Sequence, residues 1–348
     1  MPSIYGERSM PMMTFPEALE DAQRYKKRHL LLGNGFSIAC RPDIFLYGKL
    51  YENADFSKLS PTAKFAFEAL ATQDFERVIK ALRDAQKILL AYGASSSLTD
   101  TLKNDADALR ELLVQTIAAS HPAWPGEITE QEYKNCREFI ANFNNIYTFN
   151  YDLLLYWAQM HTEEGEAPNS DDGFRKQEDN YDAGYVVWEP SQSHEQNMYF
   201  LHGALHVFDT GTEIQKYTWV NTGVRLVDQI RDALSKDFFP LFVSEGTSDE
   251  KLERIRHNDY LAKAYRSFSE ITGALFIYGH SLAENDEHYL KRIEKGKVSC
   301  VYVGIYGDPN GDSNKQIISR ANKLISGRAP SRPLQVLFFD ATTARVWS

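Results

Sequence analysis

Cysteine is scarce in this chain of 348 residues. The three cysteines, Cys40, Cys136 and Cys300, lie far apart, and no Cys-x-x-Cys pair occurs. This excludes a tetracysteine zinc site and argues against a disulfide framework. Isolated thiols are typical of a reducing compartment. We therefore expect no structural metal and a cytoplasmic protein.

Long apolar runs and an excess of positive charge are also missing. No stretch approaches the roughly 18–20 apolar residues that a membrane helix needs. The first residues, which include Glu7, Arg8, Glu17, Glu20 and Asp21, lack the apolar core of a secretory signal. The net charge of −10 argues against a broad nucleic-acid surface. We expect a soluble protein that binds neither membranes nor nucleic acid directly.

The remaining composition is that of a globular protein. Hydrophobic residues make up 43% and aromatic residues 13% of the chain, which argues against disorder. The length suits two domains, or one large domain with an insertion.

Strands alternate with helices along most of the chain. Apolar runs predict strands at 29–32, 145–150, 185–188, 198–201, 241–243, 274–278, 300–303 and 334–340, and a hairpin that joins 205–209 to 214–220. Helical spacing predicts helices at 14–28, 152–161, 223–235, 249–272, 284–294 and 313–326. This alternation indicates an α/β fold with a Rossmann-like, mostly parallel sheet covered by helices on both faces.

The segment 38–143 interrupts the alternation with helical patterns only. Ser60-Pro61 begins one helix, Asp74 caps the next, and Thr129 with Glu132 forms a capping box. So much helix is too long for a simple crossover. The sequence therefore predicts a helical subdomain at 38–143, inserted into a core built from 1–37 and 144–348.

The apolar run His29 to Leu32 ends in Gly33-Asn34-Gly35-Phe36-Ser37. Glycines let a backbone turn sharply and approach a nucleotide phosphate, which the amides of the next helix can bind. The match is incomplete, because Ile38 stands where G-x-G-x-x-G has its third glycine, and the P-loop Gly-Lys-Ser/Thr is missing. By itself the stretch is equally consistent with an ordinary glycine turn.

Polar clusters follow three further apolar runs. They are Asn150-Tyr151-Asp152, His202-Gly203 and Gly279-His280-Ser281. Ligands of open α/β sheets bind at the carboxyl ends of strands, so we expect these clusters to share one site. Ser244-Glu245-Gly246, after the run 241–243, is a further candidate to line it. His280, His288 and Asp286 could suggest a metal, but no third ligand is obvious and we expect a loop on the nucleotide side of the site.

These four motifs, in this order, resemble those of the sirtuin-like NAD-consuming proteins, most of all the bacterial antiphage members that destroy NAD. That family carries Gly-x-Gly-x-Ser after its first strand, Thr-x-Asn-Tyr-Asp at a strand end, an apolar run into His-Gly, and a late Gly-x-Ser followed by an acidic residue. The corresponding stretches here are 33–37, 148–152, 201–203 and 279–281, with Asp286 as the acidic residue. The resemblance spans about 29–305.

The resemblance implies a role for each matched residue. Gly33, Asn34, Gly35 and Ser37 would hold the pyrophosphate of NAD, Gly279 and Ser281 would contact the adenosine ribose or phosphate, and Asn150 and Asp152 would face the nicotinamide ribose and carboxamide. Phe36, Gly203 and Asp286 complete the expected NAD-binding set. His202 would be the general base, and Asn150 the second catalytic residue.

The implied activity is hydrolysis of NAD+ to nicotinamide and ADP-ribose, as the effector of an antiphage system that depletes NAD. The chemistry suits these residues, because cleavage passes through an oxocarbenium-like state and a histidine near neutral pKa can take a proton from water or a ribose hydroxyl. A homo-oligomer or a defence-system partner is expected. The trigger and the choice between NAD and NADP stay open.

Other interpretations remain for the same residues. His202 could be a core histidine satisfied by a backbone group, and Asn150 could cap the helix that begins at Asp152. The protein could bind NAD or ADP-ribose as a regulatory module without turning it over. Protein deacylation or ADP-ribosyl transfer is disfavoured, because the zinc cysteines are missing and Pro42-Asp43-Ile44-Phe45 lacks the arginine of the sirtuin Pro-Asp-Phe-Arg loop.

Overall fold

A computed structural model describes residues 12–161, 170–178, 180–218, 222–243 and 248–348. Seven strands of this part of the chain form one sheet, and every neighbouring pair is parallel. In spatial order they are β1 (Met13–Thr14), β11 (Gln335–Asp340), β10 (Lys297–Ile305), β9 (Thr272–Tyr278), β2 (Arg28–Leu32), β3 (Asn145–Thr148) and β6 (Met198–Phe200). The expected Rossmann-like parallel sheet is confirmed.

The strand order contains the dinucleotide-binding arrangement 3-2-1-4-5-6. The chain starts in the middle with β2, builds outward through β3 to β6, and then crosses to the other side of β2 for β9, β10 and β11. The order therefore reverses between β2 and β9. The two strands pair in register, with Leu30 opposite Phe276. A crevice at such a reversal point is where open α/β sheets bind their ligands.

Helices cover both faces of the sheet, as predicted, and aromatic contacts show which helix lies on which face. On one face Phe276 of β9 packs 6.0 Å from Phe15 of α1 (Phe15–Asp21). On the other, Tyr147 of β3 packs 5.1 Å from Phe268 of α12 (Asp259–Ser269). Two-sided burial explains why Leu30, Leu31 and Leu32 form an unbroken apolar run with no exposed surface.

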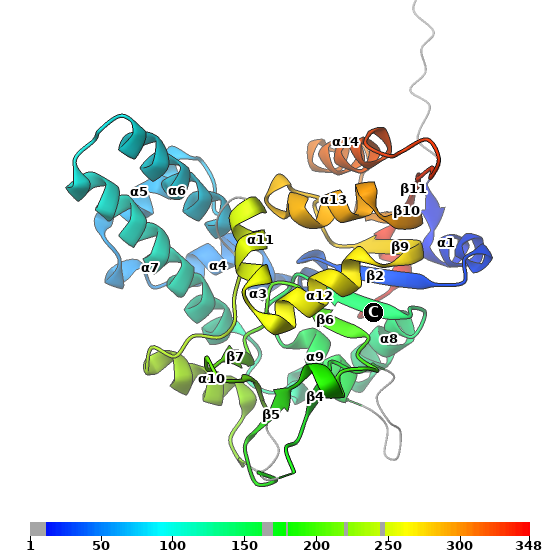
Figure 1. Ribbon diagram of the computed structural model, residues 1–348, viewed down its shortest axis with the longest axis horizontal. Helices are drawn as coiled ribbons and strands as arrows, with labels where there is room; N and C mark the ends of the chain where they lie inside the picture. Colours follow the sequence, from blue (N-terminus) through cyan, green and yellow to red (C-terminus); the bar gives the residue numbers. More distant parts are fainter. Residues whose placement is uncertain (1–11, 162–169, 179, 219–221, 244–247) are drawn as a thin grey trace, which may run out of the picture.

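The remaining core helices follow their strands, as Figure 1 shows. They are α9 (Leu154–Met160), α13 (Glu287–Lys295) and α14 (Asp312–Ser326), the last ending at Gly327 as predicted. The C-terminal tail returns to the centre of the molecule, where the indole N–H of Trp347 donates to the Phe36 carbonyl at 3.0 Å. No helix in the described part of the chain is long and apolar enough to cross a membrane.

Between β2 and β3 the chain is helical, and all of it is described. The helices are α2 (Gly35–Cys40), α3 (Pro42–Phe45), α4 (Tyr47–Asn53), α5 (Pro61–Ala69), α6 (Phe75–Ala91), α7 (Ser96–Ser120) and α8 (Glu130–Ile140). The predicted caps Ser60, Asp74 and Thr129 begin α5, α6 and α8. In Figure 1, α5 and α6 project away from the sheet. Helix α8 lies on the sheet instead, with Phe139 5.5 Å from Tyr278 of β9.

A second, antiparallel sheet has the order β4 (Phe174–Arg175), β5 (Tyr185–Trp188), β8 (Ile214–Tyr217) and β7 (Val207–Asp209). The predicted hairpin is confirmed as β7 and β8. The predicted strand 185–188 also exists, but it pairs with β8 and not with the large sheet. A short apolar run does not specify its partner, because that is decided by long-range packing.

Two predicted elements were wrong. The run 241–243 forms only an isolated bridge between Phe242 and Gly203, and α10 (Leu226–Ser235) precedes it. The predicted helix 249–272 is two helices, α11 (Ser248–Arg256) and α12. The break falls at Asn258, whose side chain accepts a hydrogen bond from the Leu261 amide and so caps α12.

Candidate functional site

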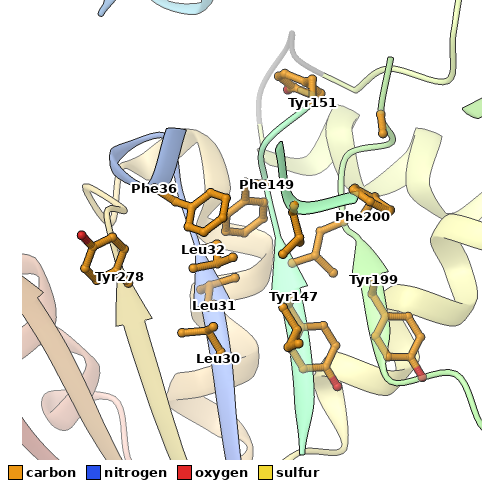
Figure 2. Packing of buried hydrophobic residues seen from close by; sticks show 14 of the residues in the cluster. Leu30, Leu31, Leu32, Phe36, Tyr147, Phe149, Tyr151, Tyr199, Phe200 and Tyr278 are labelled. Atoms are coloured by element: carbon orange, nitrogen blue, oxygen red, sulfur yellow. The ribbon is translucent and has the colours of Figure 1, made fainter. Parts of the chain in front are cut away.

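The turns that follow β2 and β9 are fastened to each other at the reversal point of the sheet. The Gly33 amide donates to the Tyr278 carbonyl at 3.0 Å, and the Gly35 amide donates to the Gly279 carbonyl at 2.8 Å. A Cβ on Gly35 would lie 2.5 Å from the Gly279 Cα, so the approach requires glycine. Figure 2 shows the ends of β9, β2 and β3 side by side. The backbone amides of Gly33 and Gly35, two of the donors expected for phosphate, are therefore already hydrogen-bonded to the end of β9 and the turn after it.

The other predicted residues of these turns differ in their access to solvent. Asn34, Gly35 and Gly279 are half-buried, and Ser281 is exposed. The side-chain nitrogen of Asn34, Nδ2, donates to the Phe45 carbonyl at 3.1 Å. Phe36, in contrast, is 1% exposed, and its ring packs 5.0 Å from the Trp347 ring. Solvent therefore reaches the backbone of the turns but not the Phe36 side chain.

Ser37, Asn150 and Asp152 form one hydrogen-bonded trio beneath the turn. The Ser37 hydroxyl donates to Asp152 Oδ2 at 2.5 Å, and Asn150 Nδ2 donates to Ser37 Oγ at 2.8 Å. All three residues are buried. Three residues predicted separately, from the ends of β2 and β3, thus share one cluster.

The trio corrects the alternative interpretation of Asn150 as a helix cap. Helix α9 begins at Leu154, with Leu153 at the N-cap position, and the Leu154 amide donates to Asp152 Oδ1 at 2.9 Å. Burial raises the pKa of the Asp152 carboxyl, and the hydrogen bonds from Ser37 and the Leu154 amide act in the opposite direction. The Asn150 side chain points to Ser37 instead.

His202, His280 and Asp286 form a second buried cluster. His280 Nδ1 accepts from the Leu282 amide at 3.1 Å, so its Nε2–H donates to Asp286 Oδ2, also at 3.1 Å. The other oxygen, Oδ1, lies 3.7 Å from His202 Nε2. His202 is 2% exposed, and its Nε2 has no hydrogen-bond partner among the described residues. It is therefore not a core histidine with Nε2 bonded to a backbone group.

Two residues that sequence analysis missed complete this cluster. Lys251 of α11, 1% exposed, places its Nζ 3.3 Å from Asp286 Oδ1 and 3.6 Å from Glu76 Oε2. Glu76 lies in the first turn of α6 and also accepts from Asn285 Nδ2 at 3.1 Å. Asp74, two residues before Glu76, was correctly predicted as the cap of α6. Neither Lys251 nor Glu76 follows a strand. Asp74-Phe75-Glu76 resembles a recurrent helix start of the sirtuin-like proteins, but it was interpreted only as a cap with a packing residue, so the part that Glu76 plays in the site was missed.

Aromatic rings join the two clusters. The Phe149 ring lies 4.6 Å from the His202 ring and 4.8 Å from the His280 ring, and the Tyr151 ring stacks 6.4 Å from His202. Asn150 stands between these two aromatic residues in the chain. Tyr47 of α4 is 44% exposed, and the carboxylates of Asp74, Glu76 and Asp286 lie near enough to act on its hydroxyl. The inserted helices thus reach the cluster at a solvent-exposed residue.

Burial and the Lys251 ammonium keep His202 neutral. Burial lowers the pKa of His202 well below its usual range, the Lys251 ammonium lowers it further, and Asp286 opposes both. The pKa of Asp286 is held well below its usual range, since Lys251 and the His280 hydrogen bond outweigh the effect of burial. Burial raises the pKa of Glu76 to about 7. The site combines a neutral imidazole, an ionised carboxylate and an ammonium.

Buried histidines make the fold sensitive to acid, which gives a first prediction. Burial lowers the pKa of His29, His121 and His288 to about 4, and that of His202 and His206 well below the usual range. Between about pH 6.5 and pH 4 the unfolded chain therefore binds protons at these five histidines that the folded chain does not. The raised pKa values of Glu76, Asp74 and Asp152 act in the opposite direction, but these carboxyls are fewer than the histidines. Urea unfolding should show the free energy of unfolding falling by at least about 1.4 kcal/mol per pH unit from pH 6 to 5. A constant value from pH 7 to 5 would contradict this.

Gly203 has a structural reason to be glycine. Its φ is +85°, and a Cβ would lie 1.9 Å from the Leu241 carbonyl oxygen. The Val243 amide donates to the His202 carbonyl at 2.9 Å, which holds 241–243 against this turn. Ser244-Glu245-Gly246, predicted to line the site, lies outside the described residues.

The two clusters do not form a metal site among the described residues, and a cavity lies elsewhere in the molecule. Within the described ranges no group of three or more His, Cys, Asp or Glu side chains could hold a metal ion, and Lys251 supplies the positive charge between Asp286 and Glu76. A cavity of about 750 Å³ opens at the other end of β10 and β11, where it is lined by Lys297 and Arg328 among others. Arg328 donates to main-chain carbonyls there, including that of Ile293 at 2.7 Å.

Comparison with known proteins returns one family. The family described as "Domain of unknown function (DUF4917)" matches residues 30–347, which includes both clusters and the inserted helices. No curated protein matches the chain.

Proposed function

The chain belongs to the family described as domain of unknown function DUF4917, and we propose that it is an NAD+ glycohydrolase that cleaves NAD+ to nicotinamide and ADP-ribose. One observation carries the proposal. The trio Ser37, Asn150 and Asp152 lies beside the His202 cluster at the reversal point of a 3-2-1-4-5-6 sheet. That is the place where such sheets bind dinucleotides.

The proposed reaction breaks the bond between C1′ of the ribose and the nicotinamide nitrogen. The electron pair leaves with nicotinamide, and C1′ gains oxocarbenium character. The oxygen of one water molecule then bonds to C1′, and His202 accepts the proton that this water loses. One water is consumed and one proton is released to solvent. A neutral imidazole is the form that can accept a proton, and burial keeps His202 in that form, although the lowered pKa makes it a weaker base than the near-neutral histidine expected from the sequence.

Asn150 is the residue that we expect to position the water. The Ser37 hydroxyl donates its hydrogen bond to Asp152. The Ser37 oxygen therefore accepts a hydrogen bond from Asn150 Nδ2. This fixes the amide and leaves Asn150 Oδ1 as the acceptor for a water or a ribose hydroxyl. Holding reactants in one orientation accounts for a large part of the rate in such reactions.

The pyrophosphate is proposed to lie against the two turns, where Ser281 is exposed and Asn34, Gly35 and Gly279 are half-buried. The resemblance to sirtuin-like NAD-consuming proteins supports these roles and those of Gly203 and Asp286, whereas Gly33 shapes the turn, because its amide already donates to the Tyr278 carbonyl. It also supports a role as an effector of antiphage defence that depletes NAD, with further copies of the chain or a partner protein as activators.

The test is NAD+ turnover by the purified protein, followed by release of nicotinamide and ADP-ribose. Asn150→Ala should lower the rate about 100-fold or more. Asn258→Ala is the matched control, because it removes another buried asparagine that caps α12 outside the site. Since an effector can require activation, total cellular NAD should also be measured after expression of each protein.

One outcome would reject the role of Asn150, and two others would reject the proposed activity. Equal NAD loss with the wild type and Asn150→Ala would remove Asn150 from the reaction. Tight calorimetric binding of NAD+ or ADP-ribose without product, and without cellular NAD loss, would identify a binding module. Nicotinamide release only in the presence of an acylated peptide would identify a deacylase.

A further inference from the structure

Lys251 is the charged group that the proposed reaction does not use. It is 1% exposed, although burying an ammonium is costly unless it is paired. Its two partners come from different parts of the chain. Asp286 lies next to α13 of the core, and Glu76 lies on α6 of the inserted segment. The ammonium thus links the insertion to the carboxylate that faces His202.

We propose that Lys251, held between Glu76 and Asp286, is a positioning residue that keeps His202 unprotonated and therefore able to act as a base. The inference rests on the proposed function for its purpose, but the charge state it assigns to His202 can be measured without turnover. It also makes the helical insertion part of the site, through Glu76.

The geometry supports this because one oxygen serves both groups. Asp286 Oδ1 lies 3.3 Å from Lys251 Nζ and 3.7 Å from His202 Nε2. A carboxylate beside a buried imidazole with no other charge nearby draws a proton onto the ring and forms an imidazolium pair. The ammonium on the same oxygen cancels that attraction. His202 then keeps one nitrogen toward Asp286 and offers the other as a base.

The other groups around His202 do not replace Lys251. His280 donates its Nε2–H to Asp286 Oδ2, and the His288 ring stacks 5.8 Å from His202, with Nδ1 3.1 Å from the Ser248 hydroxyl. Burial lowers the pKa of His288 to about 4, so this ring is neutral near pH 7. Phe149, Tyr151 and Tyr289 present uncharged rings. Lys251 is the cation among the described residues of this cluster.

Glu76 has the complementary task of holding the ammonium in place. Its Oε2 accepts from Asn285, the residue before Asp286, at 3.1 Å and lies 3.6 Å from Lys251 Nζ. Any movement of α6 away from α11 would separate Glu76 from Lys251. The base strength of His202 would then respond to the position of the inserted helices.

The test is an NMR titration of the histidine ring protons in the full-length protein, with His202 assigned as the signal lost in His202→Gln. In Lys251→Met the titration of His202 should move up by about one pH unit or more. Lys251→Arg should restore it to within a few tenths of a unit, and Lys251→Gln serves if the methionine variant does not fold. Lys216→Met is the matched control, because Lys216 is the buried partner of Asp172 in the second sheet and affects His206 instead.

The outcomes separate this inference from the proposed function. If His202 titrates at the same pH in folded Lys251→Met or Lys251→Gln as in the wild type, the assignment of Lys251 is overturned. An upward shift without any NAD+ turnover would support the charge role and reject the glycohydrolase. If turnover is present, the same variants should lose activity on the acidic side of the pH profile first, and loss at all pH values equally would also overturn the inference.

Discussion

Replacing His202 by alanine is expected to lower the rate of NAD+ hydrolysis by about 100-fold or more. The proposed reaction needs a base for the attacking water, and His202 is the neutral imidazole that lies between Phe149 and Asp286. Because the proposed dinucleotide site draws its affinity mainly from the turns after β2 and β9, we expect kcat to fall far more than the KM changes. Steady-state release of nicotinamide measures both constants.

The matched control for this experiment is His206→Ala. His206 is also fully buried, and its two ring nitrogens have no hydrogen-bond partner among the described residues, but it packs on Tyr156 and Phe200 away from Asp286. The two substitutions leave similar cavities, so thermal melting should show similar losses of stability. Full turnover by a folded His202→Ala protein would reject His202 as the base.

Gly203→Ala is expected to destabilise the fold by about 4 kcal/mol or more. The added methyl group would overlap the Leu241 carbonyl oxygen, 1.9 Å away, in a backbone conformation of φ +85° that alanine rarely adopts. The Leu241 segment cannot move aside freely, because its amide donates to the Val207 carbonyl at 2.7 Å. Urea unfolding and the solubility of the variant measure the effect.

Gly211→Ala separates the two causes of this loss. Gly211 has nearly the same φ, +83°, but nothing lies within 4 Å of an added Cβ. It should cost only about 1–2 kcal/mol, the price of the left-handed conformation. Equal losses in the two variants would show that the Leu241 contact does not constrain Gly203.

The predicted candidate residues came from the ends of apolar runs. The runs at β2, β3, β6 and β9 were visible because strands buried on both faces are continuously hydrophobic, and glycines or polar residues mark where they end. That local pattern was enough to select Ser37, Asn150, His202 and Gly279, and the structure places all of them at one edge of the sheet. Local pattern failed at 241–243, where an apolar segment supports a turn and joins no sheet.

Lys251 and Glu76 could not be found in the same way. Each lies near the start of a surface-like, charged helix, and the residues around it indicate a helix start but not a partner far along the chain. They meet because α6 and α11 pack against the loop that carries Asp286, and that packing depends on contacts between residues far apart in the chain. The hydrogen bonds that commit the Gly33 and Gly35 amides to β9 arise in the same long-range way.

The order of residues thus decided which strands are buried and which side chains stand at their ends, because both follow from local periodicity and turn chemistry. Tertiary packing decided the strand order, the pairing of Ser37 with Asn150 and Asp152, and the ammonium between Glu76 and Asp286. Hydrogen bonds and ion pairs depend on distances of a few ångströms, and only the folded chain brings these groups that close.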